Sequence, residues 1–225
     1  MDRARVPRRP AVHRSAGRLT ITVPSSLSAR PFADLLATPG VVEECELRGR
    51  FGFMAYHGGG LEETTDVIAR AAADASGASY YGVVQPASLQ RHVPSIKVTR
   101  DQSAVLDEFL DHVDVVVTIH GFGRRGLFTS LRLGGRNREL ADHVAGHLRP
   151  ALPAYRVVDD LEQIPVELQG VHERNPVNVP RDAGVQIELP PRVRGSSPLW
   201  WDWEHGLVPH TEALIAALAH AATTA

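Results

Sequence analysis

Two histidines and a glutamate are the residues of this sequence whose types and spacing suit a metal ion. His57 precedes three consecutive glycines, and Glu62 follows five positions later, in the stretch HGGGLEETT. The glycines would let the backbone bend until both side chains face one point. His120 closes a separate run, VVVTIH, and a glycine follows it. Two histidines and a carboxylate, with a fourth position left for water, are a ligand set of catalytic zinc. We therefore predict a site for one zinc ion.

The glycine loop has other interpretations. An HGGG segment is typical of the oxyanion loop of some lipases, but those enzymes need a G-x-S-x-G elbow, and no serine here stands in that frame. The loop also lacks the glycine spacing of phosphate-binding motifs. Glu62 and Glu63 would occupy the positive helix terminus that a phosphate needs. Taken singly, a histidine at a strand end or a glutamate at a helix start is an ordinary structural residue.

Glu188 is the candidate general base. It lies near the end of a predicted strand, GVQIEL, on the same side as Gln186 because side chains alternate along a strand. Zinc lowers the pKa of water to about 7, so Glu188 would take a proton from that water and pass it to the leaving nitrogen. The alternative is a structural carboxylate paired with Arg192.

Arginines crowd residues 124–138, where no acidic residue occurs. Such a run beside His120 would suit a substrate that carries carboxylates, although each arginine alone fits a solvated surface. We predict that Arg124 or Arg138 stabilises the oxyanion in catalysis. The predicted substrate-binding residues are Arg125, Arg136, Asn137, Arg192 and Lys97.

The elements that would position these residues alternate between strands and helices. Strands are predicted at 19–23, 46–56, 79–84, 95–99, 113–121, 127–135 and 184–189, and helices at 29–37, from 62 to about 77, 103–111, 137–148 and 210–223. The β-branched run at 113–121 indicates a strand buried on both faces. This order predicts an α/β domain whose mixed, largely parallel sheet is covered on both faces. His57 and His120 would meet at the carboxyl ends of its strands.

Composition limits the remaining possibilities. The 225 residues suit one domain, predicted at 19–225, preceded by a disordered basic tail at 1–18 with six arginines and one acid. Only this tail would suit nucleic acid, so such a partner is not expected. No apolar stretch suits a membrane span or a secretory signal, and Cys45 is the single cysteine. These features predict a cytoplasmic protein that binds no membrane.

Four blocks together resemble the poly-γ-glutamate hydrolase family of phages and prophages: HGGGLEETT, VVVTIHG, LRLGGRN and NPVNVPRDAGVQIELPPRVR. The resemblance extends over residues 45–220. It implies a zinc carboxypeptidase-like, three-layer α/β/α fold, zinc held by His57, Glu62 and His120, and Glu188 as general base. Lys97 departs from it, because the family commonly has a histidine there. The tryptophan-rich segment LWWDWEHG at 199–206 also departs from it, and we expect its tryptophans to pack in the core.

The sequence thus predicts a zinc-dependent amidohydrolase. The resemblance implies cleavage of γ-glutamyl amide bonds in poly-γ-glutamate, an anionic polymer. One alternative is a zinc peptidase or amidase that acts on another peptide or on a cell-wall amide. The other is a relative that binds zinc without catalysis, although a structural zinc site would need no general base. If the chain comes from a phage, lysis would release it from the cytoplasm.

Overall fold

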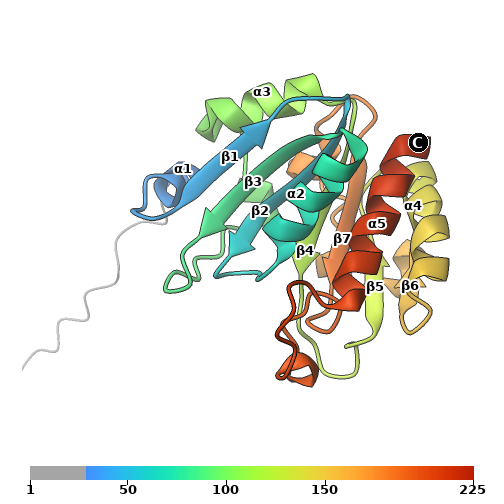
Figure 1. Cartoon of the computed structure of the whole chain (residues 1–225). Helices are drawn as coiled ribbons and strands as arrows, with labels where there is room; N and C mark the ends of the chain where they lie inside the picture. Colours follow the sequence, from blue (N-terminus) through green and yellow to red (C-terminus); the bar gives the residue numbers. More distant parts are fainter. Residues whose placement is uncertain (1–28) are drawn as a thin grey trace, which may run out of the picture.

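The computed structural model describes residues 29–225, and one sheet of seven strands runs through this part of the chain (Figure 1). The strands are β1 (Val42–Glu46), β2 (Phe51–Gly59), β3 (Ser79–Gln85), β4 (Val115–Gly121), β5 (Ser130–Leu133), β6 (Arg156–Val158) and β7 (Gly184–Leu189). The α-helices are α1 (Pro31–Leu36), α2 (Thr65–Ser76), α3 (Ala104–His112), α4 (Arg138–Ala151) and α5 (Pro209–Thr224).

The sheet is mixed and largely parallel, as predicted. Its strand order is β1-β3-β2-β4-β7-β5-β6. The pairs β2/β3, β2/β4, β4/β7 and β5/β6 are parallel, whereas β1/β3 and β5/β7 are antiparallel. The carboxyl ends of β2, β4 and β7 therefore share one edge. Because β5 runs the other way, the chain that follows it emerges at the opposite edge.

Helices cover both faces of the sheet, which gives the predicted three layers (Figure 1). On one face, α2, α4 and α5 bury Ile68, Val144 and Leu214 against the sheet. On the other, α1 and α3 bury the side chains of Phe32 and Phe109. Strand β4 contributes alternate residues to both cores, since Val117 and Ile119 belong to the first and Val116 to the second. Its continuous apolar run follows from this burial on both sides.

Several predicted boundaries were wrong. The strand predicted at 46–56 corresponds to β2, which begins only at Phe51, because the chain turns between Glu46 and that residue. The segment predicted as a strand at 95–99 is a 3-10 helix, Ser95–Lys97. Helix α2 begins at Thr65, so Glu62 lies in the preceding turn. Helix α4 continues past the predicted stop and includes Pro150 in its last turn.

The remaining sequence predictions have different outcomes. Strands β1 and β6 were not predicted: the first is rich in glutamate and the second has three residues. Core packing was wrong for Trp201, which is 84% exposed. The tail at 1–18 and the strand at 19–23 lie outside the described residues. Among the residues described, no helix has the length and apolar character needed to cross a membrane.

Candidate metal centre and active site

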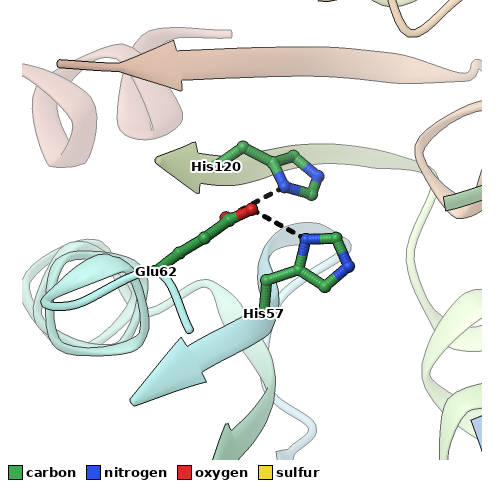
Figure 2. A group of neighbouring side chains, drawn as sticks. All are labelled: His57, Glu62 and His120. Atoms are coloured by element: carbon green, nitrogen blue, oxygen red, sulfur yellow. Dashed lines mark hydrogen bonds and ion pairs between the residues drawn. The ribbon is translucent and has the colours of Figure 1, made fainter. Parts of the chain in front are cut away.

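The predicted metal ligands converge at one edge of the sheet. His57 lies near the end of β2 and His120 near the end of the adjacent parallel strand β4, with Glu62 reaching between them (Figure 2). The backbone returns to bring Glu62 there, since its N–H donates to the carbonyl of His57 at 2.9 Å. Gly59 makes this turn possible. It has φ of +65°, and a Cβ there would lie 2.2 Å from the carbonyl oxygen of Gln85.

The donor atoms of these three residues fit a metal ion. Glu62 Oε1 lies 2.9 Å from His57 Nδ1, and Oε2 lies 3.2 Å from His120 Nδ1 (Figure 2). One ligand atom from each residue lies within 4.8 Å of the other two. Tetrahedral zinc, with bonds of about 2.0–2.2 Å, places its ligand atoms about 3.3 Å apart. The spacing therefore suits a single small cation held between the three side chains.

The outer nitrogens of the two rings explain why Nδ1 faces the cation position. Nε2 of His57 contacts the carbonyl oxygen of Val93 at 2.9 Å, and a carbonyl can only accept. That nitrogen therefore carries the hydrogen, which leaves Nδ1 with a lone pair in the neutral ring. Nε2 of His120 lies 2.9 Å from the hydroxyl of Tyr56. The lone pair of His57 Nδ1 and the Glu62 carboxylate oxygen would repel each other unless a proton or a cation lay between them. A metal ion in that position would satisfy both atoms.

Electrostatics keep the carboxylate of this group ionised. Burial alone would raise the pKa of Glu62, but His120 and His57 outweigh it and hold that pKa well below its usual range. Burial also lowers the pKa of His120, and Glu62 outweighs this effect so that the net pKa is raised. An ionised carboxylate is the form that binds metal.

Glu188 lies beside the candidate metal ligands, on β7, in register with His120 on β4. Its side chain is buried, and burial raises the pKa of Glu188 above its ordinary value, although the charge of His120 opposes the shift. A raised pKa makes a carboxylate a better proton acceptor. The Nε2 of Gln186 donates to Glu188 Oε1 at 2.9 Å, which fixes the carboxylate.

A chain of hydrogen bonds joins His120, a candidate metal ligand, to this carboxylate. His120 Nε2 meets the Tyr56 hydroxyl, which donates to Asn175 Oδ1 at 3.4 Å. Asn175 Nδ2 donates to Gln186 Oε1 at 2.8 Å, and Gln186 in turn donates to Glu188. Every donor then points from His120 toward Glu188. The two groups are thus held by one buried network, whose members polarise one another.

Two backbone features set the direction of this network. The N–H of Val177 donates to Asn175 Oδ1 at 3.3 Å, so the amide nitrogen of Asn175 must face Gln186. Gly170 lets Gln186 approach: a Cβ at position 170 would lie 2.6 Å from Gln186 Oε1. The network was not predicted, because Asn175 and Gly170 belong to a loop whose path the sequence does not reveal.

A pocket of about 710 Å³ opens over this edge. The three metal-ligand candidates and Glu188 line it, together with residues from the 92–96 and 166–175 segments. One of these is His92, whose ring centroid lies 4.9 Å from that of His57. Burial lowers the pKa of His92, and the charge of His57 lowers it further. Sequence reasoning missed His92, since no motif or regular element surrounds it.

The predicted substrate residues at this edge lie around the pocket rather than at its centre. Arg124 forms an ion pair with Glu167 at 2.8 Å, at the pocket wall. Arg125 is exposed on the same loop. Lys97 is exposed, whereas the two residues before it line the pocket. Arg192 stacks over the ring of Tyr155 at 5.6 Å, towards the β6 side of the sheet.

Three predicted residues lie at the wrong edge of the sheet. Arg136, Asn137 and Arg138 follow β5, which is antiparallel to β7, and so they emerge where β7 begins. The N–H of Asn137 donates to the carbonyl of Gly184, the first residue of β7. Arg138 donates to backbone carbonyls, including that of Leu133 at 3.0 Å. The direction of β5 therefore corrects their catalytic and substrate-binding assignments, and Arg138 instead fixes the start of α4.

Two buried arginines lie near the site: Arg194, which was not predicted, and Arg132, one of the arginines of the run 124–138 that was predicted to suit a substrate with carboxylates. Arg194 donates to the carbonyl of Glu63 and, at 3.2 Å, to that of Leu189, so it ties the loop after Glu62 to the end of β7. Arg132 lies on β5, in register with Glu188. Its signal in the sequence is a lone charged residue between Leu131 and Leu133, in a strand that is buried throughout.

Comparisons with known proteins identify the family and similar folds. The family model described as Poly-gamma-glutamate hydrolase matches residues 37–197. A structure described as a bacteriophage poly-gamma-glutamate hydrolase is similar to the chain, with a TM-score of 0.67 at 19% identity over 81% of this chain and 87% of the other. A structure described as YNDL in a zinc-free apo form is similar with a TM-score of 0.61 at 18% identity, over 80% of this chain and 89% of the other. No curated protein matches the sequence. The match to the family model covers most of the chain, which therefore belongs to the poly-γ-glutamate hydrolase family.

Proposed function

We propose that the chain is a zinc-dependent hydrolase that cleaves γ-glutamyl amide bonds of poly-γ-glutamate. Family membership supports the reaction class and the polymer. One observation carries the proposal: the donor atoms of His57, Glu62 and His120 cluster within 4.8 Å, and the same pocket holds Glu188. The choice of zinc is supported by the donor set of two imidazoles and one carboxylate. It is supported also by the similar fold of a protein described in a zinc-free form.

His57, Glu62 and His120 would hold the ion. A zinc ion bound there would act as a Lewis acid that polarises an amide carbonyl and acidifies water. Glu188 takes a proton from the attacking water and passes it to the nitrogen that leaves, which converts a poor leaving group into an amine. Its raised pKa suits both halves of that transfer. Gln186 donates its hydrogen bond to Oε1 of Glu188, so the other carboxylate oxygen is the one that would accept the proton.

The buried network has a distinct task in this mechanism. Tyr56 accepts from His120 Nε2, so Nδ1 of that ring stays open towards the metal position. The same network ends on Glu188, so the metal ligand and the base are oriented together. Positioning of this kind lowers the barrier because the reacting groups are held in place before the substrate arrives.

Size-exclusion chromatography of poly-γ-glutamate, incubated with the purified chain and zinc, tests the proposal. We expect the polymer to shorten and the products to contain only γ-linked glutamate. Glu188→Gln should lower kcat by about 100- to 10,000-fold, as is usual when a general base is lost, and should keep its zinc. Glu162→Gln removes an exposed carboxylate outside the pocket and serves as the matched control. A wild-type chain that binds zinc and leaves the polymer intact would contradict the proposed function.

A further inference from the structure

Arg132 is a buried cation whose guanidinium lacks protein partners. Its residue is 4% exposed, and its Nε and Nη1 atoms have no hydrogen-bond partner among the described residues. No carboxylate of the described chain lies within ion-pair distance of it. The contact that it does make is with the ring of Phe122, 4.9 Å from the guanidinium carbon.

Such a group is costly for the folded protein. A buried charge without hydrogen-bonded partners destabilises a folded protein, and the cation–π contact with Phe122 offsets part of that cost. Burial lowers the pKa of Arg132 and repulsion from Arg124 adds to the shift, while the charge of Glu188 on the adjacent strand opposes it without forming a hydrogen bond or ion pair. A guanidinium still remains protonated in proteins, so the charge cannot be avoided by deprotonation. A buried guanidinium without hydrogen-bond partners is suited to bind an anionic group of a ligand.

The position of Arg132 identifies which part of the ligand it meets. Four neighbouring strands, β2, β4, β7 and β5, contribute His57, His120, Glu188 and Arg132 in that order. Arg132 therefore lies on the far side of the base from the metal ligands. Phe122, which it covers, lines the pocket together with Glu188. The base delivers its proton to the leaving nitrogen, so Arg132 is on the side of the leaving amine.

In a γ-linked chain of glutamates, the leaving nitrogen is bonded to a carbon that carries a free α-carboxylate. We propose that Arg132 binds this α-carboxylate, on the glutamate that leaves with the nitrogen, by charge-assisted hydrogen bonds from its planar fork. The inference rests on the proposed function and adds the residue that reads the linkage. An α-linked chain has no carboxylate at that carbon, because the carboxyl group is consumed in the amide bond.

Two short γ-linked glutamate oligomers separate this role from others: one with free α-carboxylates and one with α-carboxamides. Wild type should prefer the carboxylate oligomer. Arg132→Gln should lower kcat/KM for that oligomer by about 10- to 100-fold, the value of a hydrogen bond to a charged group. It should leave kcat/KM for the carboxamide oligomer nearly unchanged, so the preference disappears. Arg156→Gln removes an exposed arginine on β6 and should preserve the preference.

A binding measurement supports the kinetics. Calorimetry with the Glu188→Gln protein should show that the carboxylate oligomer binds, and that adding Arg132→Gln weakens this binding by a similar factor. If Arg132→Gln slows both oligomers equally, the residue acts on the reacting carbonyl and the inference fails while the function stands. An unchanged preference also overturns it. If wild type cleaves neither oligomer nor the polymer, the proposed function itself fails. Arg132→Lys keeps the charge and should give an intermediate preference, even if the glutamine variant does not fold.

Discussion

Removal of one hydroxyl should weaken metal binding without touching a metal ligand. Tyr56→Phe deletes the oxygen that lies 2.9 Å from His120 Nε2, in a side chain that is fully buried. Water cannot easily replace that oxygen, so a buried N–H loses its partner, at a cost of about 1–3 kcal/mol. Loss of such a partner typically lowers metal affinity by 10- to 100-fold. We expect the zinc dissociation constant of Tyr56→Phe to rise by about this factor.

Competition with a chromophoric zinc chelator measures this dissociation constant directly. Tyr80→Phe is the matched control. Tyr80, on β3, is also fully buried, but its hydroxyl lies 3.4 Å from Glu44 on β1, away from the candidate metal ligands. The control should lose some stability and keep its zinc affinity. An unchanged zinc affinity in Tyr56→Phe would refute the orienting role of the hydroxyl. Equal weakening in both variants would attribute the effect to general destabilisation.

Three further predictions concern other parts of the account. Gly170→Ala forces a Cβ to within 2.6 Å of Gln186 Oε1 at a φ of +63°, so urea unfolding should show a loss of about 1–3 kcal/mol and kcat should fall. Gly126→Ala has a similar φ in open space, and its activity should be unchanged; equal effects would contradict the clash. Arg132→Met should raise the melting temperature of the ligand-free protein, because it removes an unpaired buried charge, and a lower melting temperature would disprove that cost. Burial raises the pKa of Cys45 to about 11, so at pH 8 iodoacetamide should alkylate it at least about 100-fold more slowly than a free cysteine, and a rate equal to the free thiol would contradict this.

The sequence was most informative where chemistry and local structure coincide. His57, Glu62 and His120 could be grouped because two of them end apolar strands and a glycine loop follows one of these strands. Parallel strands bring their carboxyl ends to one edge, so grouping the ends needed no knowledge of strand order. The alternation along GVQIEL likewise placed Gln186 and Glu188 on one side, and the hydrogen bond between them confirms it.

The sequence could not reveal the direction of β5. A four-residue strand has no pattern that distinguishes parallel from antiparallel pairing, and the connection to β4 fits either. Arg136 and Arg138 were therefore assigned to the site by their closeness in sequence to His120. The antiparallel pairing with β7 reverses this placement and brings Arg132 beside Glu188 instead.

Zinc titration of metal-free protein tests the central claim most directly. The metal is removed with a chelator, zinc is added back in steps, and cleavage of poly-γ-glutamate is followed by the loss of solution viscosity. We expect no cleavage without metal, a rise in rate that stops at one zinc per chain, and no recovery in a His57→Ala variant. Cleavage that persists without metal, or a fully zinc-loaded chain that leaves the polymer intact, would contradict the central claim.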